Sequence, residues 1–169
     1  MNFISLARHA DSTPSHIARV EDIDRPLSAF GITQTIAFSK KMCAKRVEHD
    51  TFYVSPAQRS IHTAIILIRE LQLGYDRIRV VKSLYNASEY ELLDFYEHEV
   101  EKEKHCMIVG HNPGISNFAS LLSGKSYSYP TMGCVTLSQK IQISQAQDGE
   151  KHPQHQFEKG YEQLFACLS

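Results

Sequence analysis

The sequence predicts an α/β fold, a three-layer α/β/α sandwich with a mostly parallel central sheet. Short apolar runs typical of buried strands alternate with longer segments in which apolar residues recur at helical spacing. This alternation favours parallel strands with helices on both faces. Histidines and arginines directly follow several predicted strands, at the sheet edge where such folds bind ligands. The 169 residues are enough to bury a core, so residues 1–169 are expected to form a single domain.

Composition argues against several classes of function. The chain has 18 basic and 19 acidic residues and a net charge of -1, which does not suit electrostatic binding of nucleic acid. No apolar run reaches membrane-spanning length, and the short run at residues 2–7 ends at Arg8 and His9, unlike a signal peptide. The four cysteines are far apart and form no CxxC pair. We therefore expect reduced thiols, a cytoplasmic protein and no metal site.

The first third of the chain predicts a strand, a loop and a helix. Residues 3–7 form an apolar run typical of a buried strand. Residues 8–26 are polar and contain two prolines, which indicates irregular structure. Ser28 is a favourable N-cap, and the apolar positions after it predict a helix to about residue 46.

A second strand and helix follow. Residues 51–54 are β-branched and aromatic, the composition of a short strand. Ser55 followed by Pro56 predicts a helix start, with the serine as cap and the proline at the first helical position. Apolar residues at helical spacing extend this helix to about residue 73, and residues 78–81 predict the next strand.

The helix-start signals recur farther along. Ser88 is the predicted cap of a helix whose charged tail, residues 97–104, is expected to be solvated. Residues 105–109 predict a strand, and Asn112 followed by Pro113 repeats the cap-and-proline pattern.

The end of the chain predicts two more strands, at residues 133–137 and 163–168. The polar residues 145–160 between them predict a loop. We expect its histidines, His152 and His155, to be exposed to solvent.

Side chains at strand ends have the chemistry of a phosphate site. Arg8 and His9 follow the first predicted strand. Arg59 lies at the start of the helix after the second strand, and His111 follows a later strand. Guanidinium groups bind phosphoryl oxygens in pairs and neutralise their charge. A neutral imidazole can attack phosphorus, and a second imidazole can stabilise the transferring group.

Each of these residues alone would also fit a structural or surface role, but their order is more specific. RHA follows a strand at residues 8–10, SPxxR at 55–59 and GHNPG at 110–114. This order resembles the histidine phosphatase superfamily (phosphoglycerate mutase-like), whose members have an RH[GA] motif, then an Sxx(x)R segment and a late GH motif.

Further segments resemble the SixA-type branch of that superfamily. Ala10 replaces the more common glycine of the first motif, as occurs in that branch. Residues 24–31 are similar to its RPLS/T…G segment, and residues 84–87 and 130–133 also resemble it. The resemblance spans roughly residues 1–138.

The resemblance implies roles for individual residues. His9 matches the histidine that accepts the phosphoryl group, and His111 matches the second histidine. Arg8 and Arg59 match the arginines that bind phosphate. No cofactor and no metal ion are expected, because the guanidinium groups take the place of a cation.

Three more residues are candidates for the substrate site. Arg25 falls where SixA-type proteins place a further basic residue, and Asn112 directly follows His111, so both are expected to bind substrate. Larger family members have a general acid on an inserted loop that this chain lacks. Glu89 is the nearest candidate by position, but it equally fits a carboxylate favoured by the dipole at a helix start. Whether the protein has a general acid stays open.

The implied activity is a metal-independent phosphatase that acts through a phosphohistidine intermediate on His9. Protein phosphohistidine is the expected substrate class, because an alkyl phosphoester needs an acid to protonate its leaving oxygen and a P–N bond needs less help. A short chain with few insertions should also leave the pocket open to a protein side chain. The loop at residues 11–24 has no assigned role and fits a lid, a docking surface or a plain connection.

Two alternatives remain. The first is a phosphatase of small phosphomonoesters. The second is a non-catalytic phosphate-binding interaction domain, against which the intact set of histidines and arginines argues. The expected partner is therefore a phosphorylated protein or a small phosphate substrate, with no nucleic acid and no membrane.

Overall fold

The sheet at the centre of the molecule has six strands in the order β3-β2-β4-β1-β5-β6. The computed structural model describes residues 3–45, 48–100, 105–142 and 158–167. β1 to β4 are parallel to one another, whereas β5 is antiparallel to β1 and β6 is antiparallel to β5. The mostly parallel sheet predicted from the sequence is confirmed. The strands are β1 (Phe3–Arg8), β2 (Thr51–Val54), β3 (Ile78–Val80), β4 (His105–Gly110), β5 (Cys134–Gln142) and β6 (Glu158–Cys167).

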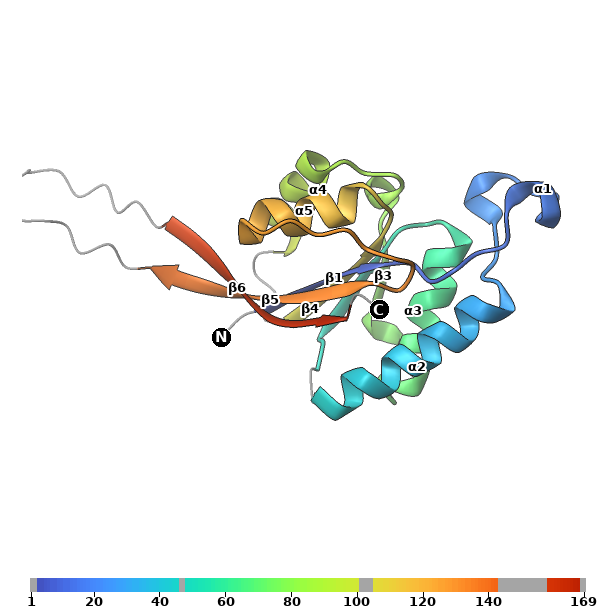
Figure 1. The fold of residues 1–169 in the computed structure, drawn as a ribbon, viewed down its shortest axis with the longest axis horizontal. Helices are drawn as coiled ribbons and strands as arrows, with labels where there is room; N and C mark the ends of the chain where they lie inside the picture. Colours follow the sequence, from blue (N-terminus) through green and yellow to red (C-terminus); the bar gives the residue numbers. More distant parts are fainter. Residues whose placement is uncertain (1–2, 46–47, 101–104, 143–157, 168–169) are drawn as a thin grey trace, which may run out of the picture.

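Helices cover both faces of this sheet. α4 and α5 pack on one face, and α2 and α3 pack on the other (Figure 1). The three-layer α/β/α arrangement is therefore confirmed. The helices are α1 (Ser15–Ala18), α2 (Ala29–Lys45), α3 (Gln58–Glu70), α4 (Glu89–Phe95) and α5 (Gly114–Ser123), with short helical turns η1 (Asp22–Asp24), η2 (Tyr75–Arg77), η3 (Lys82–Leu84) and η4 (Tyr96–Val100). None of the helices in the described ranges is long and apolar enough to cross a membrane.

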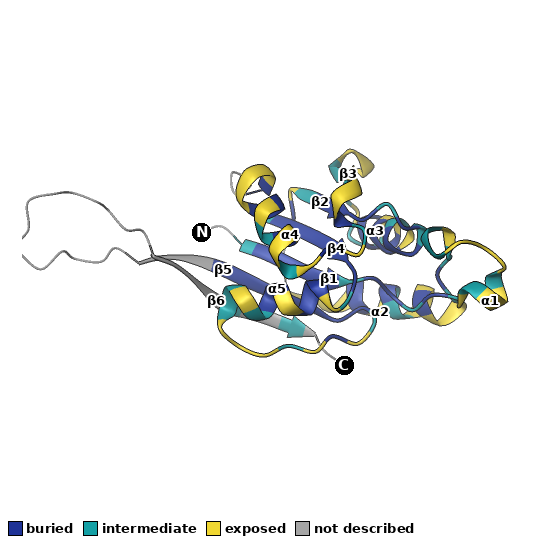
Figure 2. Ribbon diagram, turned by 90° about the horizontal axis from the view of Figure 1, so that it is seen from above, coloured by how far each residue is buried: buried dark blue, intermediate teal, exposed yellow. Residues whose placement is uncertain are grey.

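The core consists of two apolar clusters, one on each face of the sheet. In β1, Ile4 and Leu6 join the cluster beneath α4 and α5, while Ala7 joins the one beneath α2 and α3. This division follows from the alternation of side chains along a strand. Figure 2 shows the central strands as the most continuously buried part of the molecule.

Two of the predicted helix caps are confirmed. Ser28 Oγ accepts a hydrogen bond from the Gly31 amide at 3.0 Å, directly before α2. Ser88 forms a capping box with Glu91 at the start of α4. Both serines satisfy amide groups that the first helical turn leaves without a partner.

The other two predicted caps are wrong. α3 begins at Gln58, after Ala57, and no side chain caps it. α5 begins at Gly114, after Pro113, again without a side-chain cap. The polar side chains of Ser55 and Asn112 bind other partners, described below, which is why they do not cap the helices.

The C-terminal strands are longer than the sequence predicts. β5 extends to Gln142, and β6 begins at Glu158 because it pairs along the whole of β5. Part of the predicted loop, residues 158–160, is therefore strand, while residues 145–157, with His152 and His155, lie outside the described residues. The predicted helix after Ser88 ends in the π-helical turn η4, and residues 101–104 of its charged tail are also outside.

Candidate active site

His9 lies at the carboxyl edge of the sheet, directly after β1. Its amide donates to the Gly110 carbonyl at 3.0 Å, and its carbonyl accepts from the Met132 amide at 3.1 Å. The ring atom Nδ1 is 2.7 Å from the Ala10 carbonyl oxygen. Because a carbonyl can only accept, Nδ1 bears the proton and Nε2 has the lone pair. Arg59 Nε donates to that Nε2 at 3.3 Å.

The surroundings of His9 keep its ring neutral. Burial first, and then the guanidinium groups of Arg59, Arg8 and Arg25, lower the pKa of His9 to about 4, although the hydrogen bond to the Ala10 carbonyl acts to raise it. At neutral pH the imidazole is therefore unprotonated, with Nε2 available as a nucleophile.

His111 lies beside His9, with 5.1 Å between the ring centroids. Its Nε2 is 2.7 Å from Ser55 Oγ, and its Nδ1 is 3.4 Å from Arg59 Nη2. Since a guanidinium can only donate, Nδ1 accepts and Nε2–H donates to the serine. Burial first, and then His9 and Arg59, lower the pKa of His111 to about 3. Ser55, expected as a helix cap, instead orients the second histidine.

The arginines occupy different positions around the two histidines. Arg59 is buried, 3% exposed, in the first turn of α3. Arg8 is the last residue of β1, and its Nη1 donates to the Tyr129 carbonyl at 2.9 Å. Arg25 follows η1, and its Nη2 donates to Ser12 Oγ at 2.7 Å.

Asp22 joins these arginines and was not singled out from the sequence. Its Oδ2 accepts from Arg59 Nη2 at 2.9 Å and from the Tyr85 hydroxyl at 2.7 Å, and its Oδ1 accepts from Arg25 Nη1 at 3.0 Å. The hydrogen bond from Tyr85, followed by those from Arg25 and Arg59, holds the pKa of Asp22 well below its usual range. The carboxylate is therefore ionised at neutral pH.

The sequence offered one weak signal for Asp22. It stands three residues before Arg25, a spacing that lets opposite charges pair across a helical turn. That signal is common on protein surfaces, and the contacts to Arg59 and Tyr85 depend on tertiary structure.

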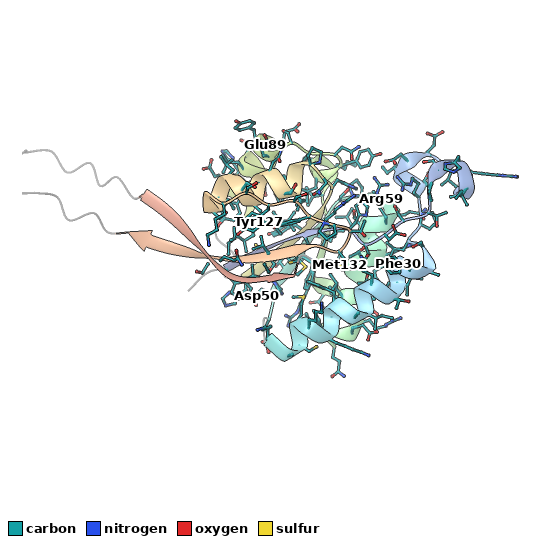
Figure 3. The ribbon with its side chains drawn as sticks, viewed as in Figure 1. Phe30, Asp50, Arg59, Glu89, Tyr127 and Met132 are labelled. Carbon is teal, nitrogen blue, oxygen red and sulfur yellow. The ribbon has the colours of Figure 1, made fainter. Side chains whose placement is uncertain are left out.

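A cavity of about 430 Å³ is lined by these side chains, and we refer to it as the His9 cavity. Of the residues expected at the site, it includes Arg8, His9, Arg25, Arg59, His111 and Asn112. Figure 3 shows Arg59 at the end of the molecule where α1 and the start of α2 lie. Three guanidinium groups face two carboxylates there, those of Asp11 and Asp22, a balance that suits an anion.

Asn112 and Glu89 differ in their placement. Asn112 lines the His9 cavity, where its Nδ2 donates to the Tyr129 carbonyl at 2.9 Å and its buried Oδ1 has no hydrogen-bond partner among the described residues. Glu89 lies in the first turn of α4, partly exposed, and its Oε2 accepts from Asn117 at 3.3 Å. Glu89 is not among the residues that line the His9 cavity.

The described residues contain no group of three or more histidine, cysteine or acidic side chains placed to hold a metal ion. The charge that would balance a bound anion is instead that of the three arginines.

Comparison with known proteins gives a family and a fold. Residues 4–84 match the model of the histidine phosphatase superfamily (branch 1). SixA from Agrobacterium tumefaciens has a TM-score of 0.73 and 23% identity, covering 82% of this chain and 92% of that one. The protein histidine phosphatase SixA complexed with tungstate has a TM-score of 0.71 and 19% identity, covering 80% and 87%. A mycobacterial glucosyl-3-phosphoglycerate phosphatase has a TM-score of 0.56 and 14% identity, covering 80% and 89%. No curated protein sequence matches the chain.

The sequence match at residues 4–84 agrees with the resemblance to the histidine phosphatase superfamily that the motifs indicate. At 23% and 19% identity, the SixA structures show that this chain shares their fold. The match to the family model supports phosphatase activity.

Proposed function

We propose that the chain is a metal-independent cytoplasmic phosphatase that takes a phosphoryl group from protein phosphohistidine onto His9 and then transfers it to water. One observation supports this most directly. The ring of His9 is neutral, is fixed by its Nδ1–H bond to Ala10, and presents Nε2 in a cavity with three arginines.

The chemistry needs two displacements at phosphorus. In the first, the lone pair of His9 Nε2 forms a new P–N bond while the bond from phosphorus to the substrate nitrogen breaks, and the leaving imidazole departs neutral, with a proton taken from solvent. In the second, water attacks the phosphohistidine, the P–Nε2 bond breaks, and phosphate and free His9 are released. Arg8, Arg25 and Arg59 neutralise charge on the phosphoryl oxygens, the main requirement of this reaction.

The carboxylates near the site favour a substrate with a good leaving group. Asp22 is held ionised and has no proton to donate at neutral pH. Glu89 lies outside the lining of the His9 cavity. An alkyl phosphoester needs its leaving oxygen protonated, whereas phosphohistidine needs less proton donation.

Trapping of the intermediate tests the proposal. Wild-type protein incubated with labelled phosphohistidine peptide and then denatured in alkali should retain label on His9, located by mass spectrometry. His9→Ala should lose both label and turnover, while the exposed-site control His98→Ala should keep them. The same turnover in excess chelator tests metal independence. Label on another residue, or activity that vanishes with chelator and returns with a divalent metal, would contradict the proposal.

A phosphatase of small phosphomonoesters is the second candidate, because a cavity of about 430 Å³ can also admit a small phosphate ester. The two candidates differ in their dependence on the leaving group. We expect phosphohistidine and aryl phosphates to be hydrolysed far faster than a sugar phosphate, and Glu89→Gln to leave these rates unchanged. Rapid hydrolysis of the sugar phosphate that collapses in Glu89→Gln would identify Glu89 as a general acid and favour the small-molecule enzyme.

A further inference from the structure

A second cavity lies beside the His9 cavity. It has a volume of about 280 Å³, and we call it the α2 cavity because one wall is the face of α2 between Phe30 and Lys41. The opposite wall is residues 130–133. The α2 wall includes positions 30, 33, 34, 37 and 38, the spacing of a single helix face.

The two cavities share one lining residue. Thr131 lines both of them. The Gln34 side chain fixes Thr131 in place, since its Nε2 donates to the Thr131 carbonyl at 2.9 Å and to Oγ1 at 3.1 Å. The same side chain accepts from the Asp11 amide at 3.1 Å, and the neighbouring Met132 amide donates to the carbonyl of His9. A group attached to a phosphoryl in the His9 cavity can therefore reach the α2 cavity by crossing Thr131.

Exposed apolar side chains occur on α1 and at the start of α2, the two helices that flank the segment containing Asp22. Phe30, on the wall of the α2 cavity, is 64% exposed, and Figure 3 shows it beside Met132 at the same end of the molecule as Arg59. In α1, Ile17 is 62% exposed. It belongs to the segment that also brings Asp22 to the site (Figure 1). Exposed apolar side chains close to a binding site favour a protein partner, because apolar surface left in water is often covered by another protein.

We propose that the α2 cavity is a docking subsite that binds an apolar side chain of the phosphorylated protein substrate, across Thr131 from the phosphoryl group. This inference rests on the proposed function. The apolar side chain would leave water for a cavity walled by Phe30, Ala37, Phe38 and Met132, and that transfer favours binding. The subsite would select among phosphohistidine proteins by the residues near the phosphohistidine, and it would contribute nothing to a substrate without an apolar group.

Filling the subsite tests this selection. Ala37 is exposed on α2, so Ala37→Trp places a large ring in the cavity without disturbing the core. Ala44→Trp is the matched control, two turns farther along the same helix and outside the cavity lining. Phe30→Ser removes the exposed apolar wall, with Ile32→Ser, 43% exposed and off the lining, as its control.

The substrates are short phosphohistidine peptides that differ only in one nearby residue, leucine or aspartate, with phosphoramidate as the minimal substrate. For at least one position of the varied residue, the wild-type protein should have a kcat/KM at least about tenfold higher for the leucine peptide than for the aspartate peptide. Ala37→Trp and Phe30→Ser should abolish this preference and leave phosphoramidate turnover unchanged, and both controls should keep the preference.

Four outcomes would count against the subsite, its occupant or the proposed function. No leucine preference in wild type, or a preference that survives Ala37→Trp and Phe30→Ser, would overturn the subsite. If Ala37→Trp slows naphthyl phosphate instead, the cavity belongs to small apolar esters. If wild type hydrolyses phosphate esters but no phosphohistidine peptide, the proposed function itself fails, and that failure is visible without any variant.

Discussion

Arg59 donates hydrogen bonds to three groups of the candidate site. Its Nε reaches His9 and its Nη2 reaches both His111 and Asp22. A lysine would keep the charge but has no planar fork to reach several partners at once. Arg59 therefore connects His9, His111 and Asp22 in one fixed geometry.

We expect Arg59→Lys to lower kcat by on the order of 10²–10³, the usual effect of losing a preorganised donor at a developing charge. Arg69→Lys, on the exposed side of the same helix and paired with Glu70, is the control and should leave kcat unchanged. Steady-state kinetics with phosphoramidate measure both. Equal kcat values for Arg59→Lys and wild type would show that charge alone is sufficient.

Asp22 places a negative charge next to the arginines that would bind phosphate. Its carboxylate lines the His9 cavity and stays ionised, so it repels a phosphate dianion in the same cavity. Asp22→Asn keeps an oxygen that can accept from Arg59 and Tyr85 but removes the charge.

We expect Asp22→Asn to lower the Kd for inorganic phosphate roughly threefold to tenfold, a gain of about 1 kcal/mol. Isothermal titration calorimetry measures the Kd. Asp24→Asn, an exposed carboxylate of the same turn η1 that does not line the cavity, serves as the control. Weaker phosphate binding in Asp22→Asn would mean that Asp22 acts mainly by orienting Arg59.

The neutral ring of His9 has a measurable consequence for pH. With a pKa of about 4, set by burial and then by Arg59, Arg8 and Arg25, His9 should remain unprotonated from pH 7 down to about pH 5 and gain its proton only near pH 4. An NMR titration of the ring Cε1–H measures this. His98 is the internal control, because the Asp94 backbone carbonyl and carboxylate raise its pKa above the ordinary value. A midpoint for His9 near 6.5 would contradict the argument.

Sequence reasoning predicted the residues that follow strands better than those that come from loops. Arg8 ends β1, and His9, Arg59 and His111 follow β1, β2 and β4. Parallel strands bring their carboxyl ends together whatever the loops do. The position of Asp22 depends on how the segment between β1 and α2 folds over the site. This polar segment has no hydrophobic periodicity from which its path could be predicted.

At the scale of the elements, contacts with residues distant in the sequence explain the two helix caps that were predicted wrongly. Ser55 and Asn112 stand where a cap is expected, but their side chains bind His111 and the Tyr129 carbonyl. A local pattern such as Ser-Pro or Asn-Pro indicates that a helix begins there. It cannot show that a distant segment will bind the polar side chain in place of the helix amides. The caps at Ser28 and Ser88 had no competitor that displaced the helix amide.

Gly114 sets the approach of α5 to the segment before α4. A Cβ added at Gly114 would overlap the backbone carbonyl of Ala87. The backbone cannot yield as a flexible side chain would, so α5 and the segment that holds Tyr85 would have to move apart.

We expect Gly114→Ala to lower the free energy of unfolding by roughly 1–3 kcal/mol, the usual cost of overpacking. Urea unfolding followed by circular dichroism gives the value. Leu121→Ala, at a position of α5 that is 47% exposed, should change stability by no more than about 0.5 kcal/mol. Stability of Gly114→Ala equal to wild type would show that the two segments separate without cost.

Across the whole molecule, buried histidines lie near both ends of the sheet. His9 and His111 are at the carboxyl ends of the parallel strands, and His49 precedes β2 at the opposite end. His49 Nε2 is 2.7 Å from Ser5 Oγ, which is in turn 2.7 Å from Thr136 Oγ1. This chain of polar contacts links the start of β2 to β1 and β5 through the core.

These histidines make the stability of the fold depend on pH. Burial and then His105 lower the pKa of His49 to about 3 in the folded protein, whereas the unfolded chain has the ordinary value near 6.5. Below pH 6.5 the unfolded state therefore binds a proton that the folded state does not, so stability falls as the pH falls toward 3. His9 and His111, whose pKa values are also lowered, act in the same direction.

Between pH 7 and pH 5 we expect His49 alone to remove about 2 kcal/mol of stability, from the two pKa values and the linkage relation. Urea unfolding of wild type and His49→Gln at pH 7, 6 and 5 measures the change, because glutamine can still bond Ser5 but does not titrate. Between pH 7 and pH 5, the free energy of unfolding of His49→Gln should fall by about 2 kcal/mol less than that of wild type. This holds even if the variant is less stable at pH 7. His98→Gln removes a histidine whose pKa is raised, so it should not reduce the acid loss. Equal acid losses in His49→Gln and wild type would mean that His49 is protonated in the folded core.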